Sequence, residues 1–102
     1  MSKLEYDGEF RSRWFNRREK ARELVARAIS GGCVEWELDR LKDASGYDRL
    51  NTKDQANFRR FSSDVRAIVS GWQTLDARER KRFLDGSLVY STLLKRMRES
   101  AG

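Results

Sequence analysis

The sequence predicts an all-α protein, a small single-domain bundle of four to five helices. The 102-residue chain contains no proline, so nothing in it interrupts a helix by removing a backbone donor. Apolar residues recur at steps of three and four along most of the chain, which is the spacing of one helix face. Glycines at positions 31, 32, 46, 71 and 86 separate these periodic segments.

The first predicted helix covers residues 7–30. The glycine pair at 31–32 ends it, since glycine is the usual residue just beyond a helix. Residues 1–9 are predicted to form a flexible arm, and residues 10–102 a single helical domain. The apolar stripe of this helix consists of Phe10, Trp14, Ala21, Leu24, Val25 and Ala28.

The segment 33–44 fits two patterns. Val34, Leu38 and Leu41 are spaced as on a helix, whereas residues 34–38 also alternate as they would in a strand. A strand needs a pairing partner, and no other segment clearly supplies one. Glu35 and Glu37 suit the first turn of a helix because the helix dipole is positive there. A helix is therefore favoured, with the strand left open.

The segment that begins at Thr52 has the clearest helical pattern. Residues 52–55 resemble a capping box, with Thr52 as the N-cap and Gln55 three positions later. We expect this helix to be the central one of the core. Its apolar stripe consists of Phe58, Phe61, Val65, Ile68 and Trp72.

Two further helices are predicted at residues 76–85 and 88–99. The first is short and contains the evenly charged basic run 78–82, and this run is expected to be exposed. The second is expected to begin after Ser87 as its N-cap and to carry basic residues in its last turn. Its apolar residues are Val89, Tyr90, Leu93, Leu94 and Met97.

The charge of the chain favours a polyanionic partner. Lysine and arginine number 22 against 16 acidic residues, which gives a net charge of +6 and an isoelectric point near 9.9. The basic excess lies in residues 10–30 and 49–102, whereas residues 33–48 are predominantly acidic. We therefore expect a basic surface and a smaller acidic one on the same molecule.

The sequence lacks the residue types that several kinds of catalytic and metal-binding site require. Without histidine there is no imidazole base and no imidazole metal ligand, and no catalytic residue, metal site or cofactor is predicted. Cys33 is the only cysteine, which suits a reducing compartment. No apolar run approaches the roughly 20 residues that span a bilayer. We expect no membrane partner and a cytoplasmic location, with a host nucleoid or nucleus as alternatives.

Arginine and large aromatic residues are interleaved in residues 10–18 and again in residues 58–61. Such pairing suits contact with phosphates and bases, although it also occurs where arginine stems cover the rim of a core. On the first helix, Arg13, Lys20 and Arg27 repeat every seven residues along one flank, and Arg11, Arg18 and Arg22 line the other. The sequence thus favours a small basic, non-enzymatic helical protein that binds the nucleic-acid backbone, in particular that of a duplex. The candidate nucleic-acid-binding residues are Arg11, Arg13, Arg17, Arg18, Lys20, Arg27, Arg78, Arg80, Lys81 and Arg82.

A protein-protein interaction module is the alternative function. If residues 33–44 are helical, Trp36 projects away from the apolar stripe, beside the acidic Glu35 and Asp39. A large ring among carboxylates is typical of an interface anchor, although packing within the domain explains the ring equally well. Such a module would be an accessory or inhibitory protein of a virus or mobile element. It would engage an acidic protein surface through its arginines or assemble as a homo-oligomer.

Overall fold

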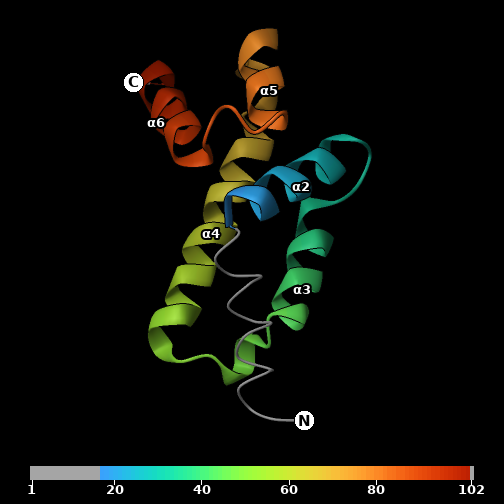
Figure 1. The fold of residues 1–102 in the computed structure, drawn as a ribbon, viewed down its shortest axis with the longest axis vertical. Coiled ribbons are helices and arrows are strands. Elements are labelled where there is room, and N and C mark those ends of the chain that lie inside the picture. The colour runs from blue at the N-terminus through green and yellow to red at the C-terminus, as the bar shows by residue number, and fades with distance from the viewer. Residues whose placement is uncertain (1–16, 102) are drawn as a thin grey trace.

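The computed structural model of the chain describes residues 17–101 (Figure 1). This part of the chain contains five α-helices, two short 3-10 turns and no strand, which confirms the predicted all-α bundle. The predicted arm 1–9 and the predicted helical residues 7–16 lie outside the described residues. The elements are α2 (Arg17–Ile29), α3 (Val34–Ala44), η1 (Tyr47–Arg49), α4 (Thr52–Ser70), η2 (Trp72–Thr74), α5 (Ala77–Leu84) and α6 (Tyr90–Ala101).

The glycine pair ends α2 as the sequence predicts. Gly31 has a φ of +105°, a left-handed conformation that side chains other than glycine rarely adopt. The Gly32 N–H then donates to the carbonyl oxygen of Arg27 at 3.1 Å, which is the long bond of a Schellman motif. The chain can therefore reverse and bring α3 back beside α2.

Residues 34–44 form a helix, so the strand alternative is wrong. Cys33 precedes α3 in an extended conformation, and the Glu37 N–H donates to the Cys33 carbonyl at 3.0 Å to start the helical bonding. At the other end, the hydroxyl of the buried Ser45 donates to the carbonyl of Lys42 at 3.0 Å. The helical spacing of the apolar residues therefore outweighs the short alternating pattern.

The predicted capping box of α4 does not form, and the N-cap lies one residue earlier than predicted. The Asn51 side chain, rather than that of Thr52, accepts a hydrogen bond from the Asp54 N–H at 2.8 Å, so Thr52 is the first helical residue. At its far end α4 stops at Ser70, and Trp72 belongs to η2. Trp72 nevertheless stays in the core with 5% of its surface exposed.

The start of α6 also differs from the prediction. Ser87 is not its N-cap: the Ser87 N–H donates to Asp85 Oδ1 at 2.8 Å within the turn that follows α5. Leu88 is buried, and α6 begins only at Tyr90, with the Leu93 N–H bonded to the Val89 carbonyl at 3.1 Å. The turn between α5 and α6 is therefore longer than the sequence indicated.

The short helix α5 is better anchored than its charge suggests. Asp76 and Glu79 form a reciprocal capping box at its first turn, a device that the sequence interpretation missed. Phe83 is 1% exposed and lies edge-on to Trp72 at a ring-centroid distance of 5.9 Å. The inner face of α5 therefore packs into the core through Phe83.

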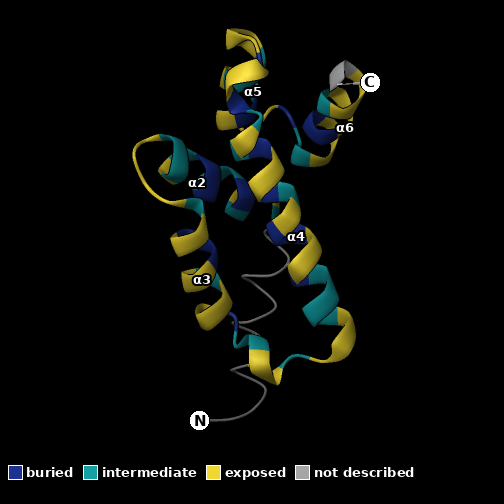
Figure 2. Ribbon diagram, turned by 180° about the vertical axis from the view of Figure 1, so that it is seen from behind, coloured by how far each residue is buried: buried dark blue, intermediate teal, exposed yellow. Residues whose placement is uncertain are grey.

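The core forms where α2 meets the other helices. α2 contacts α3, α4, α5 and α6, and it lies across the upper half of α4 in the view of Figure 1. Figure 2 shows the buried positions gathered in that region, whereas most of α3 is exposed. The buried apolar residues are Ala21, Leu24, Val25, Leu38, Phe58, Phe61, Val65, Ile68, Trp72, Leu75, Phe83, Leu88, Leu93 and Leu94.

Truncation of Phe61 should destabilise the fold strongly. Phe61 is 2% exposed and lies edge-on to Tyr90, with 6.2 Å between ring centroids, so the Phe61→Ala cavity lies between α4 and α6. We expect a loss of about 3–5 kcal/mol in the free energy of unfolding, measured by urea denaturation. Ser63→Ala, on the exposed face of the same helix, should change it by less than about 0.5 kcal/mol. A loss below about 1 kcal/mol for Phe61→Ala would show that α4 is not central to the core.

Candidate nucleic-acid interface

The candidate basic residues that the structure describes come from two helices that contact each other, α2 and α5. Arg11 and Arg13 lie outside the described residues. The two flanks of α2 face different neighbours, so the arginines of this helix divide into separate groups. The candidates on α2 are Arg17, Arg18, Lys20 and Arg27, and those on α5 are Arg78, Arg80, Lys81 and Arg82.

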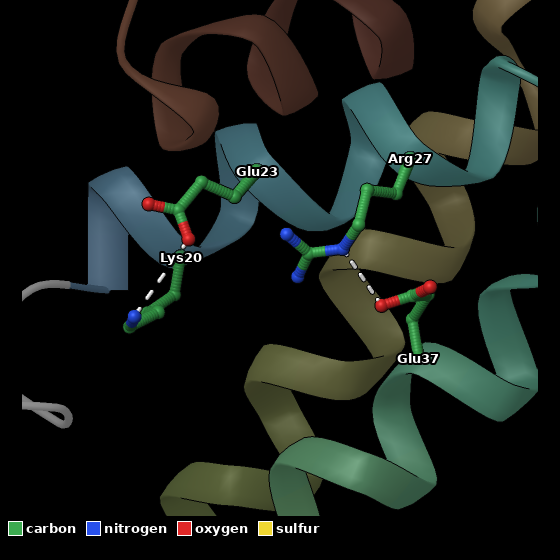
Figure 3. A network of polar contacts seen from close by, with 4 residues as sticks. All are labelled: Lys20, Glu23, Arg27 and Glu37. Carbon is green, nitrogen blue, oxygen red and sulfur yellow. Dashed lines mark hydrogen bonds and ion pairs between the residues drawn. The ribbon is translucent and has the colours of Figure 1, made fainter.

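One flank of α2 is engaged with carboxylates. Arg27 Nε donates to Glu37 Oε1 of α3 at 2.8 Å (Figure 3). The Glu37 side chain is only 6% exposed, so this bond compensates a carboxylate that is almost fully removed from water. Lys20 Nζ lies 3.7 Å from Glu23 Oε1 on its own helix. Arg27 therefore holds α2 to α3, while about half of its side chain, 51%, remains exposed.

The other flank of α2 faces the connection between α5 and α6. Arg18 and Arg22 line a small pocket of about 140 Å³ together with Gly86 and Tyr90. Gly86 has a φ of +88°, and a Cβ atom on it would lie 2.6 Å from Arg22 Nη1. Glycine thus permits both the turn and the close approach of the Arg22 guanidinium. This flank joins α2 to the segment that directly follows the basic run of α5.

The basic run of α5 is not uniformly exposed. Arg80 donates from Nε to the Trp72 carbonyl and from Nη2 to the Gln73 carbonyl, each at 3.1 Å. Arg80 therefore satisfies backbone acceptors of η2, and its guanidinium has a structural role. Arg78 and Lys81 are exposed, whereas Arg82 is half-buried. The members of this run that face solvent are thus fewer than the sequence suggests.

The α5–α6 connection is surrounded by positive charge. Hydrogen bonding from Ser87 lowers the pKa of Asp85, and the nearby cations Lys81 and Arg82 add to that effect. On the other side, burial raises the pKa of Tyr90, while the cation Arg17 acts in the opposite direction. Cations of α5 thus act on Asp85 at one end of the connection, and a cation of α2 acts on Tyr90 at the other.

The predicted interface residues on α3 divide between two roles. Trp36 is 56% exposed, and the guanidinium carbon of Arg40 lies 4.8 Å from the centroid of its ring. Glu35 instead accepts two hydrogen bonds from Arg66 of α4, at 2.6 and 2.9 Å, and these bonds lower its pKa. Asp39 is exposed on the same helix. Glu35 therefore joins α3 to α4, and the outward surface is formed by Trp36, Arg40 and Asp39.

Comparisons with protein-family models, curated proteins and solved structures give no match for this chain. Within residues 17–101, no three acidic or cysteine side chains converge in a way that could hold a metal ion. Over the same residues, no helix has both the length and the apolar character needed to cross a membrane. The geometry of the charged surfaces is therefore the basis for assigning a function.

The sequence interpretation missed two residues that organise these surfaces, Glu37 and Arg66. Glu37 lies three positions after Val34 and four before Leu41, which places it inside the apolar stripe of α3. This position in the sequence indicates a buried ion pair, because a carboxylate in a buried stripe requires a cationic partner. Arg66 gave no comparable signal, since its partner Glu35 is 31 positions away in the chain.

Removal of the Arg27 guanidinium should destabilise the protein, because it leaves the buried Glu37 carboxylate without its donor. We expect Arg27→Ala to lower the free energy of unfolding by about 1–3 kcal/mol in urea denaturation. Combining it with Glu37→Leu should recover much of that loss, because no buried charge is then left unpaired. Arg18→Ala, an exposed position on the same helix, should stay within about 0.5 kcal/mol of wild type. Equal effects of the two single changes would contradict a structural role for Arg27.

Proposed function

We propose that the chain is a small non-enzymatic protein that binds the backbone of duplex nucleic acid through one basic surface. This surface, the α2/α5 surface, consists of Arg18 and Arg22 of α2 with Arg78, Lys81 and Arg82 of α5. The observation that supports it best is the packing of the Arg22 guanidinium against Gly86, in the connection that follows the basic run. Two basic segments far apart in the sequence thereby contribute to one region.

The chemistry of these side chains suits phosphate. Arginine offers a planar fork of N–H donors that matches phosphate oxygens, and lysine adds a point charge. Neutralisation of phosphates releases condensed counterions, so the affinity should fall steeply as salt rises. Contacts to the backbone carry no direct sequence information, and binding by this surface should depend on duplex shape and charge. A net charge of +6 adds long-range attraction to any polyanion.

Charge reversal on the α2/α5 surface should weaken duplex binding. Arg18→Glu and Lys81→Glu, made separately, each remove one expected phosphate contact and add a repulsive charge. We expect each variant to flatten the log-log dependence of affinity on salt by about one unit, measured by fluorescence anisotropy with two unrelated duplexes. Both duplexes should respond alike, because the contacts are with the backbone.

Lys53→Glu is the matched control for these variants. Lys53 is exposed at the start of α4, far from α5 in the view of Figure 1, and its reversal changes the net charge by the same amount. It should lower the affinity only slightly, through the general field of the protein. Wild-type protein that binds neither duplex at low salt would refute the proposal, and so would equal losses in all three variants.

The second candidate function is that of a protein-interaction module, and the exposure of the Trp36 ring favours it. The described residues expose few large apolar side chains, and Trp36 is the most exposed of them. Trp and Arg are the residues most enriched among those that dominate interface energies, and here Trp36 lies beside Arg40. The partner in this proposal is a protein surface or a second copy of the chain.

Trp36→Ala should separate interface binding from folding. The ring is 56% exposed, so its removal should leave the melting temperature within about 2 °C of wild type. If Trp36 anchors a partner, its loss should weaken association by about thirtyfold or more. Sedimentation across a concentration series tests self-association, and affinity capture after nuclease treatment tests a protein partner. A large drop in melting temperature would assign the ring to the fold instead.

A further inference from the structure

A small pocket lies between α2 and the connection from α5 to α6 (Figure 1). Its volume is about 140 Å³, well below the roughly 300 Å³ at which pockets for drug-sized ligands begin. Phe83 and Leu88 line it, but they are 1% and 5% exposed and offer almost no apolar surface. The pocket therefore suits a small polar group, held by the polar residues of its lining.

Two arginines of α2, Arg18 and Arg22, line this pocket and are not engaged with carboxylates. Neither forms an ion pair within residues 17–101, where the paired cations are Lys20, Arg27, Arg66 and Arg96. The half-buried Arg22 guanidinium lies against Gly86, where a Cβ atom would be 2.6 Å from Nη1. Its position is thus set by close packing, and its N–H donors stay available to a ligand.

Tyr90 lines the pocket on the side of α6 and is the first residue of that helix. Burial raises the pKa of Tyr90, and the cations Arg17 and Arg18 act against that effect. The hydroxyl therefore stays protonated at neutral pH and can donate a hydrogen bond. Among the described residues of the lining, Glu19 is the one carboxylate, and it is exposed.

The donors of this lining suit a phosphate monoester better than a phosphodiester. Two guanidinium groups and a hydroxyl match the three oxygen atoms of a monoester, which carries a charge of about −1.5 to −2 at pH 7. A phosphodiester within a strand carries a single charge. It also continues into the chain on both sides, which a pocket of about 140 Å³ does not accommodate. A monoester ends the chain and can enter.

The surroundings of the pocket favour a nucleic-acid strand as the source of the monoester. Arg78, Lys81 and Arg82 of α5 precede Gly86 in the chain and belong to the same α2/α5 surface. They supply cations for the phosphates that follow the terminal one in a strand. Inorganic phosphate and a phosphorylated protein side chain bring no such row of charges.

We propose that this pocket binds the terminal phosphate of a nucleic-acid strand, with Arg18 and Arg22 donating to the phosphate oxygens. The inference rests on the proposed function, because both arginines belong to the α2/α5 surface. It adds a preference for phosphorylated ends over internal positions of the duplex.

The test compares duplexes of one sequence that carry 5′-phosphate, 3′-phosphate or hydroxyl ends, by fluorescence anisotropy. Wild type should bind a phosphorylated duplex about fivefold or more tightly than the hydroxyl-ended one, because the terminal dianion adds charge-assisted bonds. A hydroxyl-ended duplex about two base pairs longer is the control for charge, since it adds about the same number of charges as diesters. In NMR spectra of the ¹⁵N-labelled chain, the phosphorylated duplex should shift the Gly86 and Tyr90 amides more than the hydroxyl-ended duplex does.

Arg22→Lys tests the guanidinium without changing the net charge. It should remove most of the preference for phosphorylated ends, because lysine lacks the planar fork of donors. Arg40→Lys on α3 is the matched control and should keep the preference, since Arg40 does not line the pocket. Urea midpoints equal to that of wild type would show that both variants are folded.

Glu19→Gln tests the same site in the opposite direction. Removal of the carboxylate from the lining should strengthen binding of the phosphorylated duplex by about twofold more than binding of the hydroxyl-ended one. Glu23→Gln makes the same charge change on the same helix, outside the pocket, and should affect both duplexes alike.

The outcomes separate this inference from the proposed function. If the phosphorylated duplexes bind no better than the longer hydroxyl-ended duplex, the inference fails and the duplex proposal stands. Absence of binding to every duplex overturns both. Inorganic phosphate or a phosphoserine peptide that binds as tightly as the phosphorylated duplex also overturns the inference, because the strand would then contribute nothing. Wild-type duplex comparisons and amide shifts decide the matter even if a variant fails to fold.

Discussion

Close packing of α2 across α4 is the constraint on which the rest of the structure depends. Ala21 and Val25 are fully buried and Leu24 is 2% exposed, and through this short stripe α2 contacts all four other helices. A small residue at position 21 allows the two helix backbones to approach closely. Because the stripe faces the core, the two arginine flanks of α2 must face different neighbours. The flank with Arg27 meets α3, and the flank with Arg22 meets the α5–α6 connection.

Two ion pairs link α3 to its neighbours. Because the pairs differ in burial, they contribute differently to stability. Arg27 and Glu37 pair at the edge of the core, where loss of either partner leaves a desolvated group. Arg66 and Glu35 pair in solvent, with side chains 47% and 58% exposed, so this pair contributes little to stability but fixes the orientation of α3 relative to α4. These pairs neutralise part of the acidic charge of α3 internally. Of the acidic residues predicted to form a surface, only Glu37 is buried, whereas Asp39, Asp43 and Asp48 remain exposed.

The sequence predicted the helices, which depend on local periodicity. It did not predict the roles of side chains whose bonding partners lie far away in the chain. The stripe of α4 follows from spacing, and the helical state of residues 34–44 follows from spacing together with the lack of a strand partner. The N-cap prediction for α4 was wrong because Asn51, one residue earlier, accepts from the Asp54 N–H and its carbonyl accepts from the Gln55 N–H. Among the candidate site residues, the roles of Arg27 and Arg80 follow from contacts with Glu37 and the η2 carbonyls, which only the tertiary fold creates. Composition shows how many arginines there are but not which of them are engaged in the fold.

The arginines of the described residues thus belong to two populations. Those that donate to a carboxylate or carbonyl at a helix junction hold elements together, and their positive charge is locally compensated. Others do not: Arg18 and Arg22 line the pocket beside the α5–α6 connection, and Arg40 lies over the Trp36 ring. A polyanion bound at the α2/α5 surface, as proposed, would therefore meet Arg18 and Arg22 rather than the arginines that hold helices together.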